Sequence, residues 1–133
     1  MAEVAEASIA ELRRMLRSGE TTAVELVDAY LARIDAYDSA GPRLNAVVVR
    51  NPEARVEACA SDERRSRGVT LGPLDGIPYT AKDSYLARGL TAAAGSPAFE
   101  RLVAQRDSFA IERLRAGGAI LLGLTNMPPM ATI

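Results

Sequence analysis

The sequence lacks histidine and tryptophan, and it contains one lysine, Lys82, among 16 basic residues. Without histidine, the chain can assemble neither a Ser-His-Asp or Cys-His mechanism nor a histidine metal site. All the other basic residues are arginine, which keeps its proton at physiological pH, whereas a buried lysine can lose it. The single lysine therefore draws attention to its position, although a lone lysine could also lie there by chance.

Cysteine and long apolar runs are equally scarce. One cysteine, Cys59, excludes an intramolecular disulfide and offers no metal cluster. The longest apolar stretch, 116–124, is interrupted by glycine and is far shorter than the ~20 residues that a membrane span needs. The acidic start MAEVAEASIAELRR does not have the pattern of a signal peptide. With a net charge of −1, we expect a cytoplasmic protein with no nucleic-acid or membrane partner.

The remaining composition is typical of a globular domain, with 48% apolar and 25% charged residues. Capping signals at Ser8, Thr22, Asn51 and Asp107 predict the starts of four helices. In the first two helices, Glu11 and Glu25 complete capping boxes, and Ile9 and Tyr37 are among the residues expected on the apolar faces. Runs rich in apolar and β-branched residues predict strands over 44–49, 77–82 and 119–122.

Strands that alternate with helices predict an α/β fold, in which helices cover a mostly parallel sheet. Such sheets bind ligands beyond the carboxyl ends of their strands. Lys82 and the pair Thr125-Asn126 both fall at expected strand ends, so we expect the functional site there. The charged run 62–67 is interpreted as a solvated helix end rather than a phosphate-binding patch, because acidic and basic residues are mixed in it. After Asn126 the chain starts a new segment and stops at Ile133, so we expect it to be truncated.

From Leu71 onward the sequence resembles the amidase signature family. Residues 72–83, GPLDGIPYTAKD, match the family segment G-P-L-x-G-I-P-x-x-x-K-D, and 91–96 are similar to its T-x-x-G-S stretch. Residues 114–123 match its L-R-x-A-G-A-x-x-x-G pattern apart from one extra glycine, and Thr125-Asn126-Met127 follows. The resemblance implies part of a three-layer α/β/α sandwich with a mostly parallel or mixed sheet, preceded by N-terminal helices. Residues 1–70 would be a helical lead-in with one short strand, and 71–133 the start of the amidase core.

The family hydrolyses amides by a Ser-Ser-Lys mechanism, without a metal or organic cofactor. A lysine relays protons through a serine held by a cis peptide bond, and that serine activates a second, nucleophilic serine. The resemblance maps the lysine onto Lys82, while the two serines and the oxyanion donors belong to a loop beyond Asn126 that this sequence does not contain. The relay needs a neutral amine, which burial beside Ile77, Pro78 and Ala81 would favour. A carboxylate of Asp83 pointing at the amine would oppose it, and an ordinary surface pair of the two residues is the alternative.

Other residues in the matched region receive smaller roles. Ser84 and Ser96 do not align with the family serines, and Ser84 would share a strand face with Lys82. Asp107 is expected to be a helix cap, and Asn126 either braces the loop beyond it or caps a helix. Two further positions, Asp75 and Leu124, depart from residues that the family often has there. Asp75 would alter the entrance of the site or cap a turn, and Leu124 would give a drier strand end.

The leading hypothesis is that the intact protein is an amidase acting on a small-molecule amide. The isolated chain is expected to be inactive because it contains no matching nucleophile. One alternative is a non-catalytic remnant or subunit that binds a complementary C-terminal segment or chain through its sheet edge, and homo-oligomers are also possible. Another alternative is an amidotransferase A-type subunit. The residues alone do not separate these hypotheses, and they leave the substrate open.

Overall fold

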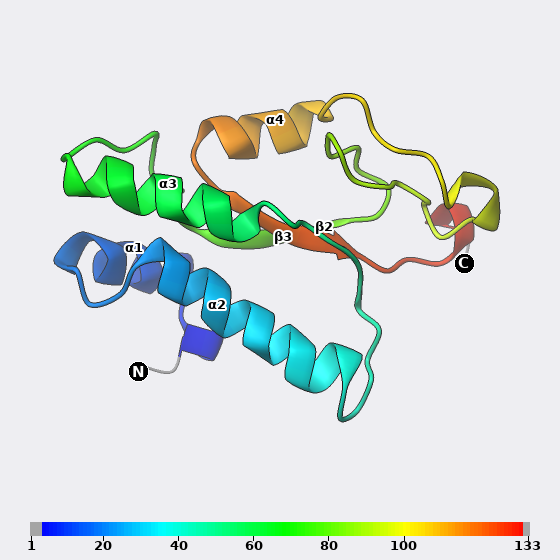
Figure 1. Cartoon of the computed structure of the whole chain (residues 1–133), viewed down its shortest axis with the longest axis horizontal. Coiled ribbons are helices and arrows are strands. Elements are labelled where there is room, and N and C mark those ends of the chain that lie inside the picture. Colours follow the sequence, from blue (N-terminus) through cyan, green and yellow to red (C-terminus); the bar gives the residue numbers. More distant parts are fainter. Residues whose placement is uncertain (1–3, 132–133) are drawn as a thin grey trace.

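The computed structural model describes residues 4–131, which form a small sheet with helices on both faces (Figure 1). Four α-helices are present in the described chain: α1 (Ile9–Ser18), α2 (Ala23–Arg33), α3 (Ala54–Ser66) and α4 (Phe109–Ala116). Three strands accompany them: β1 (Val47–Arg50), β2 (Pro78–Lys82) and β3 (Ile120–Thr125). Short helical turns lie at η1 (Val4–Glu6), η2 (Ile34–Ser39), η3 (Pro97–Phe99) and η4 (Pro129–Ala131).

The two N-terminal helices begin where the sequence predicts. The capping boxes of Ser8 with Glu11 and of Thr22 with Glu25 are both formed, and Gly19 ends α1 at a φ of 75°. Their apolar faces are narrower than expected: the side chain of Ile9 is 55% exposed and lies in the first turn of α1, away from the packed face. Tyr37 is 50% exposed because α2 passes into the π-helical turn η2, where the wider turn breaks the 3.6-residue period.

Helix α3 begins at Ala54, three residues after Asn51, the cap predicted from the sequence. The Asn51 side chain accepts a hydrogen bond from the Glu53 N–H (3.1 Å) and donates one to the Leu121 carbonyl (2.8 Å), so it joins the start of α3 to β3. The charged end of α3 was predicted to be a solvated helix end, and this prediction is incomplete. The Asp62 carboxylate accepts hydrogen bonds from the N–H groups of Ala23 (2.7 Å) and Val24 (3.0 Å), and so caps the neighbouring helix α2.

The sheet has the order β1-β3-β2, with β2 parallel and β1 antiparallel to the central strand β3. It is therefore mixed, and the strand predicted to be buried on both faces is its centre: every residue of β3 except Thr125 is buried. Gly123 permits the close approach of β1, because a Cβ there would lie 2.3 Å from the Val49 carbonyl oxygen. A side chain at this position would force the two strands apart.

Two apolar clusters fill the spaces on either side of the sheet. Helices α1, α2 and α3 pack on the face that presents Ile120 and Leu122. Helix α4, through Ile111, and the loop around Leu90 pack on the opposite face. Figure 1 shows the sheet between α4 above and α1 and α2 below. The α/β fold with helices on both faces, predicted from the sequence, is thus confirmed.

The start of α4 differs from the prediction. Ser108, not Asp107, is the N-cap residue, and its side chain makes no capping hydrogen bond. The Asp107 carboxylate instead accepts a hydrogen bond from the Arg88 N–H at 2.7 Å. Asp107 therefore holds the loop before Leu90 against the start of α4, a contact with no sequence signal because its partner is a backbone group 19 residues away.

Candidate functional site

Lys82 is the last residue of β2, and it lies beside Thr125, the last residue of β3. Because the two strands are parallel, their carboxyl ends meet at one edge of the sheet, as expected for a site in an α/β fold. The Lys82 Nζ donates a hydrogen bond of 2.9 Å to the backbone oxygen of Asn126, the first residue after β3. The structure therefore brings together the residues that the sequence places at strand ends.

The surroundings of Lys82 differ from the expectation of an apolar pocket. Lys82 is exposed, and Ala81 packs instead with the apolar cluster under α4. Ile77 belongs to the cluster on the other face and lies before the start of β2. Adjacent residues in a strand point to opposite faces, so the side chain of Ala81 cannot cover that of Lys82. Within residues 4–131, the amine is held by one backbone acceptor rather than by burial.

Asp83 does not oppose or neutralise Lys82 directly. No ion pair within 4.0 Å joins the two side chains, and Asp83 is buried with only 3% of its surface exposed. Its carboxylate accepts a hydrogen bond from the Ala93 N–H (3.3 Å), and its carbonyl accepts one from the Ala94 N–H (3.1 Å). Asp83 thus fastens the loop at 91–96 to the end of β2, and the alternative of a simple Lys82–Asp83 surface pair does not hold.

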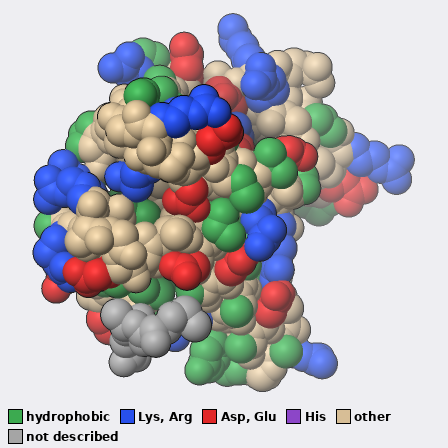
Figure 2. Space-filling view, turned by 60° about the vertical axis from the view of Figure 1, so that its left-hand side comes forward, with side chains coloured by type: hydrophobic (Ala, Val, Ile, Leu, Met, Phe, Trp, Pro, Cys, Tyr) green, Lys and Arg blue, Asp and Glu red, His purple; other side chains and the backbone are tan. Residues whose placement is uncertain are grey.

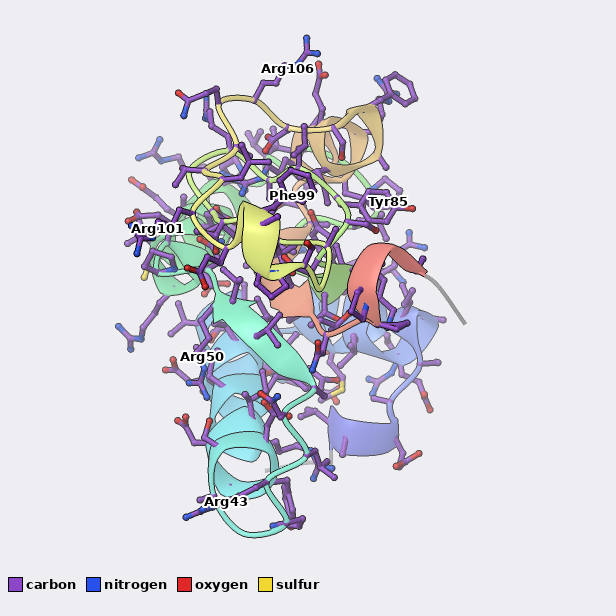
Figure 3. The ribbon with its side chains drawn as sticks, turned by 90° about the vertical axis from the view of Figure 1, so that its right-hand side faces the viewer. Arg43, Arg50, Tyr85, Phe99, Arg101 and Arg106 are labelled. Carbon is purple, nitrogen blue, oxygen red and sulfur yellow. The ribbon has the colours of Figure 1, made fainter. Side chains whose placement is uncertain are left out.

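The loop at 91–96 also packs against the segment that follows β3. Gly95 has a φ of 69°, and a Cβ there would lie 2.5 Å from the Met127 carbonyl oxygen and 3.0 Å from the Pro128 carbonyl carbon. Only glycine fits this approach, so the G-S stretch is placed beside the residues after Asn126. Figure 3 looks onto this end of the molecule, where η3, labelled at Phe99, and η4 lie in front of the sheet.

Neither serine of the matched region is positioned as a nucleophile by its hydrogen bonds. Ser96 caps η3, where its hydroxyl accepts the Ala98 N–H at 3.3 Å. Ser84 lies in the turn after β2, so the strand does not continue through it as expected. The Tyr85 N–H closes that turn on the Lys82 carbonyl at 2.9 Å.

Asn126 braces the entry to β1 rather than capping a helix. Its N–H donates to the Ala46 carbonyl (2.8 Å), and its side-chain amide donates to the Asn45 carbonyl (3.1 Å). Its side-chain oxygen accepts the Met127 N–H at 2.9 Å. The Asp38 carboxylate in turn accepts the N–H groups of Ala46 and Val47, so η2 fixes the strand entry that holds Asn126. The sequence carries no signal for this role of Asp38, which depends on a contact across the loop.

Asp75 lies before the amino end of β2, at the opposite end of the strand from Lys82, and so cannot shape the entrance expected there. It is buried and paired with Arg64 at 2.8 Å, and it accepts hydrogen bonds from the Ser61 hydroxyl (2.8 Å) and the Leu71 N–H (2.9 Å). The hydrogen bond from the Leu71 N–H closes the turn at 71–75, which agrees with the alternative expectation that Asp75 caps a turn. Burial opposes its charge, but the hydrogen bonds outweigh burial and hold the pKa of Asp75 below its ordinary value.

Other site classes find no support in the described chain. No three acidic or cysteine side chains within residues 4–131 are grouped as metal ligands. No helix there is long and apolar enough to cross a bilayer. Leu124, beside the site, is fully buried, which agrees with the drier strand end expected from the sequence.

Comparison with known proteins agrees with this arrangement. The fold and the paired strand ends define an α/β domain of the kind found in amidases, and the family model described as Amidase matches residues 25–133. The chain belongs to the amidase family. It is 36% identical to the A subunit of the glutamyl-tRNA(Gln) amidotransferase of Streptomyces coelicolor, over 98% of this chain and 26% of that protein. The corresponding protein of Synechococcus sp. (strain WH7803) is 42% identical, over 93% of this chain and 25% of that protein.

Solved structures of amidases also superimpose closely on this chain. The native peptide amidase from Stenotrophomonas maltophilia superimposes with a TM-score of 0.92 at 40% identity, covering 96% of this chain and 26% of that one. A bacterial aryl acylamidase of the amidase signature family superimposes with a TM-score of 0.84 at 29% identity, covering 93% of this chain and 26% of that one. The chain thus spans about a quarter of the length of the relatives that it matches.

Proposed function

We propose that the protein containing this chain hydrolyses a carboxylic amide to an acid and ammonia or an amine. The observation that carries the proposal is the hydrogen bond from the Lys82 amine to the Asn126 carbonyl, at the point where β2 and β3 end together. This contact directs the one lysine of the chain toward the segment after β3, which in this family leads to the serine loop. Membership of the amidase family and similarity to a peptide amidase support the same reaction class.

In this proposal residues 1–133 form the first part of one amidase domain. Lys82 accepts and returns a proton through a serine on the following loop, and a second serine attacks the amide carbon to form an acyl-enzyme. Backbone N–H groups of the same loop stabilise the oxyanion. Because Lys82 is exposed within the described chain, its desolvation depends on that loop covering it. We therefore expect the isolated chain to be inactive.

A second candidate function is that of an amidotransferase A-type subunit, which releases ammonia for a partner. It is favoured by the names of the relatives, several of which are A subunits of glutamyl-tRNA(Gln) amidotransferases at 36–42% identity. Strand β2 lies at one end of the sheet order, so its outer edge is unpaired in the described chain and open to a complementary segment. A free amidase and a subunit differ in whether hydrolysis needs a partner.

The test is an activity screen of the gene product that contains this chain, against aliphatic and aromatic amides and glutamine. Lys82→Ala and Lys82→Arg should both abolish turnover, because arginine keeps the charge but cannot relay a proton. The control for folding is made on the isolated chain, where Lys82 is exposed. Both variants should unfold there like the wild type, since substitutions at exposed sites change stability by at most about 0.5 kcal/mol. Activity retained by Lys82→Arg would contradict the relay role.

A parallel assay of the isolated chain separates the remaining alternatives. Turnover by this chain, lost in Lys82→Ala, would refute the expected inactivity and direct attention to Ser84 and Ser96. Glutamine hydrolysis that appears only with a stoichiometric partner would favour the amidotransferase subunit.

A further inference from the structure

A basic pocket lies near the amino end of β2, at the opposite end of that strand from Lys82. Its volume is about 400 Å³, within the range of small-molecule sites. Helices α1 and α3 both end beside it, on the left in Figure 1, and the loop at 70–73 closes it. Arg13 and Arg17 from α1 and Arg65 from α3 line it together with Thr70. Figure 2, which turns this end forward, shows basic side chains along its left-hand margin.

The acidic residue of the pocket lining, and one acidic residue close to each set of pocket arginines in the sequence, already have basic partners. Asp75, the one acidic residue in the lining, pairs with Arg64. Glu20 pairs with Arg14, and Glu63 pairs with Arg67. By contrast, the three arginines of the pocket form no ion pair with any acidic side chain in residues 4–131. The pocket therefore gathers three cations with no protein anion to balance them.

Arg65 is held in place and incompletely satisfied. Its Nη2 donates a hydrogen bond of 2.7 Å to the Asp75 carbonyl, which fixes the guanidinium at the base of the pocket. Its Nε is buried without a hydrogen-bond partner among the described residues. A buried polar group without a partner is costly and commonly marks a place where a water or an ion binds.

The ends of α1 and α3 do not cancel this charge. Each helix carboxyl terminus carries roughly half a negative charge, so the two together offset about one of the three arginines. About two positive charges remain. Helix-dipole compensation explains why basic residues stand in these last turns, but it does not account for all three facing one hollow.

We propose that this pocket binds a small phosphate-bearing anion with two or more negative charges, such as a pyrophosphate or phosphate-ester group. Guanidinium groups recognise phosphate oxygens with paired, charge-assisted hydrogen bonds. Arg65 provides the fixed contact, Arg13 and Arg17 close over the ligand from α1, and the Thr70 hydroxyl adds a neutral donor. The site is independent of the amidase chemistry, since it lies at the amino end of β2 and Lys82 at the carboxyl end.

The experiment measures pyrophosphate binding to the full chain by calorimetry, in buffers of equal ionic strength. The test variant is R13Q/R17Q, whose two side chains are exposed, so that the fold is retained. The matched control is R101Q/R106Q, which removes the same charge from exposed residues at the opposite end of the molecule, labelled in Figure 3. Circular dichroism serves as the check that both variants are folded.

We expect wild type and control to bind one pyrophosphate with the same affinity, and R13Q/R17Q to bind about tenfold more weakly or worse. Binding should weaken as salt rises. Equal losses in both variants would show nonspecific charge attraction and overturn the proposal. Failure of wild type to bind pyrophosphate, or binding of a short RNA with none of pyrophosphate, would overturn it as well.

Discussion

Replacement of Asp75 by alanine should remove a buried carboxylate that joins α3 to the turn before β2. The Asp75 carboxylate is fully buried and receives hydrogen bonds from Arg64, Ser61 and Leu71. These contacts join the end of α3 to the turn before β2. Asp75→Ala leaves all three donors without their acceptor, and breaking a buried pair in this way costs about 3–5 kcal/mol. Because the Arg64 side chain keeps 29% exposure and can turn to water, we expect the lower part of that range.

The matched control is Asp28→Ala, which breaks an Arg–Asp pair between α2 and α3. The side chains of Arg55 and Asp28 are 62% and 45% exposed, so water already competes with this ion pair. We expect little measurable change there. Urea denaturation followed by circular dichroism gives the free energy of unfolding for both variants. If Asp75→Ala lost no more stability than Asp28→Ala, the reasoning from burial would be refuted.

The pH dependence provides a second measure of the same contact. Because the pKa of Asp75 is lowered in the folded chain, the ionised carboxylate stabilises the fold above the ordinary carboxyl pKa of about 3.9. This contribution is lost as the pH falls through the lower pKa of the folded state. The stability gap between wild type and Asp75→Ala should therefore narrow below about pH 4 and stay constant at neutral pH.

Two further predictions use the same unfolding assay, and a third uses the absorbance of tyrosine. Gly118→Ala should lower the free energy of unfolding by more than about 2 kcal/mol, because φ is 84° and the new Cβ would lie 2.6 Å from Asp75 Oδ1. The control Gly19→Ala, at a φ of 75° with open space around it, should lower it by only about 1 kcal/mol. Equal losses in the two variants would exclude the clash. Tyr79→Phe should be neutral or stabilising, because the Tyr79 hydroxyl is buried without a partner, whereas Tyr30→Phe removes a 2.8 Å bond to the Val4 carbonyl and should cost about 1 kcal/mol. Burial raises the pKa of Tyr79 to about 12, and it also raises the pKa of Tyr30. Absorbance titration should therefore show a late-ionising tyrosine that is lost in Tyr79→Phe. The free energy of unfolding should fall above about pH 10, where the tyrosine of the unfolded chain ionises first.

The elements of the fold were predictable because their signals are local. The capping boxes at Ser8 and Thr22 and the apolar run of β3 depend on neighbours within a few residues, and all three predictions are confirmed. Two of the errors, at Asp107 and Asp62, arise because the side chain binds a backbone group that is distant in the sequence. Asp107 accepts a hydrogen bond from the Arg88 N–H, and Asp62 accepts one at the start of α2. Neither contact follows from the spacing of residues within the helix to which the sequence assigns the side chain.

The candidate site was predictable in position but not in environment. Strand ends follow from the pattern of elements, so the sequence was enough to place Lys82 and Asn126 together. It was not enough to show that Lys82 is exposed, because Ala81 points to the other face of the sheet and Ile77 lies before the strand. The Asp38 brace was also invisible, since it requires η2 to fold back onto the entry of β1.

The two ends of β2 are held by different forces, and this difference makes the proposed function testable without interference from stability. At the amino end, Asp75 joins α3 to the strand through buried charge, so its loss should weaken the fold. At the carboxyl end, Asp83 and Asn126 hold the loops through backbone hydrogen bonds. Lys82 lies among these contacts but contributes one exposed bond. A variant at Lys82 that loses activity while unfolding like the wild type would therefore report on chemistry alone.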